Sequence, residues 1–140
     1  MSRLVPMFLL VTVVTITAIW FSGRLSEKTS QVSGPDAMVP VTVPPLSAAA
    51  EQGARAFNDN CAVCHGTNAA GRAGSGPPLV HIIYEPNHHG DASFHMAVRN
   101  GVRSHHWSFG DMAPVPGVSE DEVASIIAYV RELQRANGIH

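Results

Sequence analysis

Charged residues are scarce in this chain, and cysteines are scarcer still. Only 14% of the 140 residues are charged, and the net charge of −2 comes without blocks of one sign. Nucleic-acid binding is therefore not expected. The apolar share of 45% excludes a disordered or collagen-like chain. The two cysteines, Cys61 and Cys64, lie too close together to form a disulfide framework. Their chemistry has to be sought elsewhere.

The longest uncharged apolar run is at residues 4–21. A membrane-spanning helix needs about 17–25 residues, so the run is just long enough. Trp20 and Phe21 stand at its far end, where aromatic side chains favour the membrane interface. A cleaved signal peptide and a buried soluble helix are the alternatives. A signal peptide has a shorter apolar core and small residues at a cleavage site, and no such site follows Phe21 closely. We therefore predict an uncleaved membrane anchor at residues 1–22.

The composition divides the rest of the chain into a linker and one folded domain. Residues 23–46 are rich in Ser, Val, Thr and Pro without a persistent apolar period, which predicts an exposed linker. Residues 47–140 contain three segments of helical character, near 48–58, 91–101 and 119–133. The last has the clearest start, because Ser119 followed by Glu122 forms a capping box. No stretch shows sustained strand alternation, so the predicted fold class is all-α.

Cys61-Ala62-Val63-Cys64-His65 is the C-x-x-C-H motif of covalent haem attachment. Two thiols at this spacing can each add to one vinyl group on the same porphyrin edge, and the adjacent imidazole is carried to the iron. A redox dithiol would expect a preceding strand, and a zinc site would lack a second cysteine pair. Haem c is attached outside the bacterial cytoplasmic membrane, which orients the anchor with Met1 inside.

The second axial ligand is expected to be Met112. It lies in a loop just before the capped terminal helix, from which a side chain can reach the open haem face. Methionine and histidine together are the ligand pair of cytochromes c. Met96 falls within the middle helix and is expected to pack in the core. A histidine ligand and an open site remain alternatives.

Six histidines fall between Leu79 and Met112: His81, His88, His89, His95, His105 and His106. They are interpreted as hydrogen-bonding loop residues around the haem edge. A second metal, copper being the plausible one, and a replacement iron ligand are the alternatives. The sequence does not indicate whether the two adjacent pairs meet. Tyr84, Trp107 and Phe109 are expected to line the haem pocket, and Tyr84, Arg99 and Arg103 are candidates to contact the haem propionates.

The order of these motifs resembles class I cytochromes c, in particular bacterial membrane-anchored monohaem cytochromes. The motifs that carry the resemblance are Cys61–His65, then Gly76-Pro77-Pro78-Leu79, then Met112-Ala113-Pro114 before a terminal helix with Tyr129. The resemblance implies a cytochrome c-like fold around one covalent haem c, with Pro77 and Leu79 among the cofactor-binding residues. It implies that the Pro77 carbonyl accepts a hydrogen bond from His65. It also implies that the first and last helices cross through Gly53, Phe57 and Tyr129. Ala113 departs from the family, which often has proline after the ligand.

The expected function is single-electron transfer. Iron with both axial positions filled has no vacancy for oxygen or peroxide, so no enzyme activity and no small-molecule substrate are predicted. The expected donor and acceptor are membrane redox complexes, and the expected location is the periplasmic face of a bacterial inner membrane. Copper binding or delivery through residues 81–106, a haem sensor or enzyme, and a fixed subunit of a respiratory complex are the alternatives.

Overall fold

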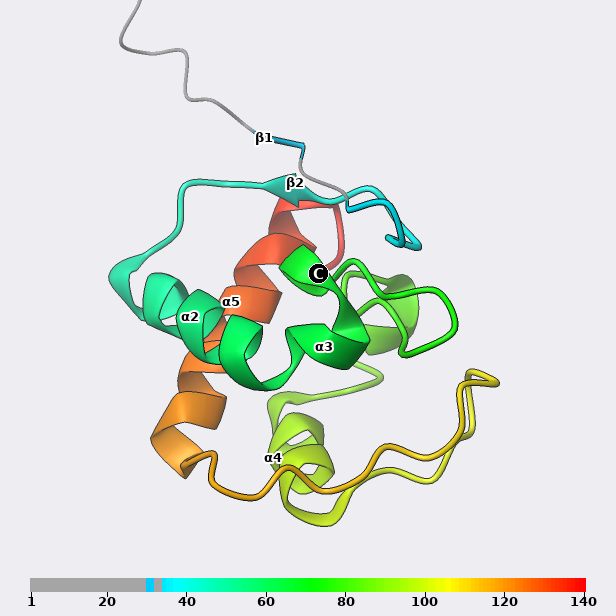
Figure 1. Ribbon diagram of the computed structural model, residues 1–140. Helices are drawn as coiled ribbons and strands as arrows, with labels where there is room; N and C mark the ends of the chain where they lie inside the picture. The colour runs from blue at the N-terminus through cyan, green and yellow to red at the C-terminus, as the bar shows by residue number, and fades with distance from the viewer. Residues whose placement is uncertain (1–29, 32–33) are drawn as a thin grey trace, which may run out of the picture.

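The computed structural model describes residues 30–31 and 34–140, and helices dominate this part of the chain (Figure 1). The elements in order are β1 (Ser30–Gln31), β2 (Thr42–Val43), α2 (Ala48–Asn60), α3 (Ala62–His65), the 3₁₀ turns η1 (Thr67–Ala69) and η2 (Ile82–Tyr84), α4 (Asp91–Asn100) and α5 (Glu120–Ala136). The two short strands pair antiparallel. The all-α prediction is therefore confirmed.

The predicted membrane anchor lies outside the described residues. Within the described part of the chain, no helix combines the length and the apolar character that crossing a membrane requires.

Helices α2 and α5 cross each other and form the centre of the domain (Figure 1). At the crossing, Gly53 lies so close to α5 that a Cβ there would overlap the backbone carbonyl of Ser125. One turn further on, the Phe57 and Tyr129 rings meet edge to face, with centroids 5.6 Å apart. Such a pair adds about 0.5–1.5 kcal/mol beyond the area it buries. The crossing implied by the resemblance is therefore present in the fold.

Both crossing helices begin at a serine cap, as the sequence predicts for α5. The Ser119 hydroxyl accepts from the Glu122 N–H while the Glu122 carboxylate accepts from the Ser119 N–H, which completes the capping box. Ser47 caps α2 by accepting from the Ala50 N–H at 3.2 Å. The buried face of α5 continues from its first turn to its last: Val123, Ile126, Ile127, Tyr129, Val130, Leu133 and Gln134.

The segment before α2 packs against the domain, although its composition predicted an exposed linker. Val41 is fully buried in the core, and Ala37 and Val39 pack against that core. The Asn137 side chain clasps Thr42 by accepting from its N–H and donating to its carbonyl, both at 2.9 Å. Residues 37–43 therefore belong structurally to the folded unit, because Val41 joins the core cluster that contains Leu133 of α5 and Thr42 is hydrogen-bonded to Asn137.

A buried polar pair on α5 holds the chain between α3 and α4. Arg131 donates to the carbonyls of Tyr84 and His89 and to the carboxylate of Asp91. Gln134 donates to the carbonyls of Leu79 and Tyr84. Buried polar groups are stable only when their hydrogen bonds are made, and here they satisfy loop carbonyls that no regular element would pair.

The opposite side of the domain is built differently. No residue of α4 is buried, and Phe94 and Val98 are only half covered. The long loop after α4, at residues 101–118, extends away from the helices (Figure 1). Its base is closed by an antiparallel bridge in which Val102 and Met112 exchange backbone hydrogen bonds of 2.9 Å. This side offers half-covered apolar surface where the α2–α5 side offers a closed core.

Candidate haem site

The two thiols stand on one tight turn at the end of α2. Cys61 is the residue at which α2 ends, and its carbonyl accepts from the N–H groups of Cys64 and His65 at 3.1 and 2.9 Å. Cys64 is exposed, whereas Cys61 is half-buried against the core. Burial, with a smaller contribution from Cys64, raises the pKa of the Cys61 thiol to about 11. Both thiols therefore lie at the junction of α2 and α3, one half-buried and one exposed.

His65 is oriented by a backbone carbonyl. Its Nδ1 lies 2.9 Å from the Pro77 oxygen, and because a carbonyl can only accept, Nδ1 carries the proton. Burial lowers the pKa of His65, while this hydrogen bond opposes the shift, so the ring is held neutral with a lone pair on Nε2. Ligand histidines in proteins are typically oriented in this way. The contact between His65 and Pro77 that the resemblance implies is present.

Met112 lies at the base of the long loop, held by its bridge to Val102. Its side chain is half-buried. The expectation for Met96 was wrong: its side chain is 55% exposed on the outer face of α4, because that helix turns Phe94 and Val98 inward instead. Of the two, Met112 is the methionine in a covered position, and its role as the iron ligand stays a prediction.

The aromatic residues expected to line the pocket come together in part. The rings of Trp107 and Phe109 stack with centroids 6.0 Å apart, and His81 meets the indole edge to face at 5.2 Å. The Trp107 Nε1–H is buried without a hydrogen-bond partner. Tyr84, whose pKa is raised by burial, lies near this indole, yet no hydrogen bond of normal geometry joins them. Leu79 packs instead in the α2–α5 core.

The two arginines proposed to contact the haem propionates lie in different surroundings. Arg99 pairs with Glu120 at 2.5 Å, and Glu120 also pairs with His95. Arg99 is therefore engaged by the protein itself. Arg103 is exposed in the long loop, where its carbonyl accepts from His105.

Two features of the site region were not predicted from the sequence. The first is the buried pair of Arg131 and Gln134. In the sequence they look like two ordinary polar residues on the exposed face of a helix. The second is the meeting of the two histidine pairs, of which His88, His89 and His106 have ring nitrogens within 4.8 Å of one another. The adjacent pairs were a visible signal, but their meeting depends on how two loops fold.

The residues present fit a covalent haem. Two thiols share one turn, a neutral imidazole beside them offers a free Nε2, and a buried indole N–H lacks an acceptor. Half-covered apolar residues of α4 and the long loop would be covered by a large flat apolar group. A haem supplies such a group, and its carboxylates are acceptors for a buried donor.

Comparison with known proteins gives a consistent result. The family model described as cytochrome c matches residues 50–134, which is more than half of the chain and spans α2 to α5. No curated protein and no solved structure matches the chain. The chain therefore belongs to the cytochrome c family, whose members carry covalently bound haem c and transfer electrons between redox protein partners.

Proposed function

We propose that this chain carries single electrons through one haem c, which Cys61 and Cys64 hold covalently and whose iron His65 and Met112 ligate. The observation that carries this proposal is the 2.9 Å contact between His65 Nδ1 and the Pro77 oxygen. It presents the second ring nitrogen as a ligand beside the two thiols. Haem iron, when bound, supplies the one-electron chemistry.

The protein groups tune that chemistry by their position. The hydrogen bond to Pro77 fixes the tautomer of His65 and increases the donor strength of its Nε2. A thioether from Met112 favours ferrous over ferric iron and so raises the reduction potential. The buried Trp107 N–H would donate to a haem carboxylate, which satisfies a donor that otherwise has no partner.

Electron transfer follows from filled axial positions. Iron that His65 and Met112 both ligate has no open position for oxygen, peroxide or another small ligand. A substrate would then have no position at which to bind iron, and redox partners would exchange electrons with the haem by docking on the protein surface. Such docking is usually small and transient.

The amino-terminal run supports a membrane-bound form of this carrier. We propose that residues 1–22 anchor the chain in a bacterial inner membrane and that the domain functions in the periplasm between membrane redox complexes. Intact mass measurement of the protein from the membrane fraction tests this. A mass that includes residue 1 is expected, and a soluble form shortened near residue 22 would contradict the anchor.

The test of the ligand set uses the full chain, expressed with the haem-maturation machinery. The ferric protein should show the weak charge-transfer absorption of methionine sulfur bound to iron. Met112→Ala should abolish this band and let ferrous iron bind carbon monoxide rapidly. Met96→Ala is the matched control, because Met96 is exposed and should leave both properties unchanged.

Two outcomes would contradict the proposal. A band that survives Met112→Ala would assign the ligand to another residue. Rapid carbon monoxide binding by the unmodified protein would show an accessible iron and favour a sensor or an enzyme.

A further inference from the structure

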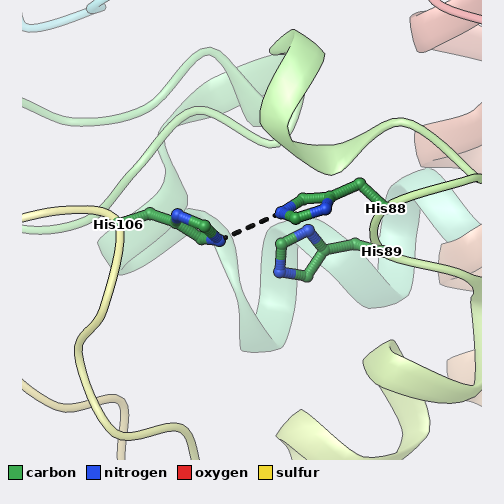
Figure 2. A group of neighbouring side chains, drawn as sticks. All are labelled: His88, His89 and His106. Atoms are coloured by element: carbon green, nitrogen blue, oxygen red, sulfur yellow. Dashed lines mark hydrogen bonds between the residues drawn. The ribbon is translucent and has the colours of Figure 1, made fainter.

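Two pairs of adjacent histidines, distant in sequence, meet on one surface of the domain. His88 and His89 lie in the turn before α4, and His105 and His106 lie in the long loop after it. Figure 2 shows His106 approaching His88 and His89 from the other loop. We propose that this cluster binds a divalent transition-metal ion, for which Zn²⁺ is the best match, at a site separate from the haem iron.

The spacing of the ring nitrogens matches that of metal ligands. The Nε2 atoms of His88 and His106 lie 3.3 Å apart. One ring nitrogen from each of His88, His89 and His106 lies within 4.8 Å of the other two. Four ligands arranged tetrahedrally around Zn²⁺ at its usual nitrogen distance are about 3.4 Å apart. The separation between His88 and His106 is therefore close to a tetrahedral edge, and small rotations of these two exposed rings would bring their nitrogens nearer to that of His89.

Backbone carbonyls set the tautomers of two of these rings. His89 Nδ1 lies 2.7 Å from the Ile83 oxygen, and His105 Nδ1 lies 2.8 Å from the Arg103 oxygen. Because carbonyls only accept, both rings carry their proton on Nδ1 and leave Nε2 as a lone pair. Metal-bound histidines are typically held by such a contact on the opposite nitrogen. The backbone thus prepares these two rings as ligands.

His105 can complete the coordination. Its ring centroid lies 4.2 Å from that of His106, and its ring stacks on His89 at 6.0 Å. Three imidazoles with a water are an ordinary ligand set for Zn²⁺, and a fourth imidazole would take the place of the water. Calcium and magnesium require oxygen ligands, so an all-imidazole cluster excludes them.

Two anchored segments hold the ligands in place. The carbonyl of His89 accepts from Arg131 of the buried α5 network. The His106 loop returns to the bridge between Val102 and Met112. A bound ion would therefore join the turn at 85–90 to the loop that carries Met112.

The test is a Zn²⁺ titration of the full-length protein with its haem attached. Bound metal is first removed with a chelator, and binding is then measured by titration calorimetry. One ion per chain is expected. The double variant with His88→Ala and His106→Ala should lose at least a hundredfold in affinity. His140→Gln is the matched control, because it removes a histidine outside the cluster and should bind as the unmodified protein does.

A second readout separates metal binding from general damage. Zn²⁺ should slow amide hydrogen exchange at residues 101–110 in the unmodified protein and leave the double variant unchanged, while the haem spectrum of both stays the same. Equal Zn²⁺ affinity in the unmodified protein and the double variant would overturn the proposal. So would the absence of a saturable one-to-one site.

Discussion

The α2–α5 side of the domain and the side formed by α4 and residues 101–118 are stabilised in different ways. On the first side, Phe57, Tyr129 and Val130 are at most 2% exposed and pack against one another. On the second, α4 buries no residue, and the loop is held by one bridge, by a backbone hydrogen bond from Val115 to Val98 and by a few side-chain hydrogen bonds. Interiors stabilise a fold only when they are closely packed. The α2–α5 side therefore has a closed core made by the protein alone, whereas the apolar residues of the second side are half covered and would be covered further by a bound group.

The largest expected effect comes from a substitution at the crossing of α2 and α5. Gly53→Ala places a Cβ on the carbonyl of Ser125, so α2 and α5 must separate along their whole crossing. We expect a loss of about 3 kcal/mol in the free energy of unfolding, at the upper end of what overpacking usually costs, measured by chemical denaturation monitored by circular dichroism. Gly34→Ala is the matched control, because open space surrounds that position. Equal stability of the two variants would refute the view that this crossing is closely packed.

A glycine-to-alanine change on the side formed by α4 and residues 101–118 should act locally. Gly101 has a φ of +74°, and a Cβ there would overlap the carbonyl of Met112. Gly101→Ala should therefore cost about 1–3 kcal/mol and displace the loop segment that carries Met112. The expected signature is a weakened methionine charge-transfer band with little change in helical circular dichroism. Loss of helix comparable to that of Gly53→Ala would mean that the two sides are not separable.

The smallest expected effect concerns a buried phenol in the core. The Tyr129 hydroxyl donates to Asn68 Oδ1 at 3.1 Å, and a neutral hydrogen bond of this kind contributes about 1 kcal/mol. Burial raises the pKa of Tyr129 from 10 to about 12. The folded state then holds its proton where the unfolded state has lost it, so stability should fall as the pH rises from 10 to 12. Tyr129→Phe should lower stability at pH 7 and reduce this fall. An unchanged fall in the variant would assign it to other groups.

What could be predicted from the sequence is mostly local. The C-x-x-C-H motif and the Ser119 capping box each depend on residues within one or two turns, and both have the expected local structure. The crossing of α2 and α5 was available through the family resemblance, since a glycine and an aromatic residue mark it.

What could not be predicted depends on contacts between distant segments. Val41 is buried in the same core cluster as Leu133 of α5, and nothing in the proline-rich segment around it indicates that. The direction of Met96 follows from which face of α4 turns inward, as Phe94 and Val98 do, and its residue type alone did not give it. The histidine pairs meet only because two separate loops fold back toward each other. Such contacts depend on the assembled fold, and no single stretch of sequence encodes them.

The clasp between Asn137 and Thr42 has a consequence for orientation. It fixes the incoming chain beside the end of α5, while the long loop of residues 101–118 lies on the far side of the domain (Figure 1). If the amino terminus is held in a bilayer as we propose, the tether joins the domain at the end of α5. The loop that carries Met112 would then lie opposite the point of attachment, open to partners that approach from the aqueous side.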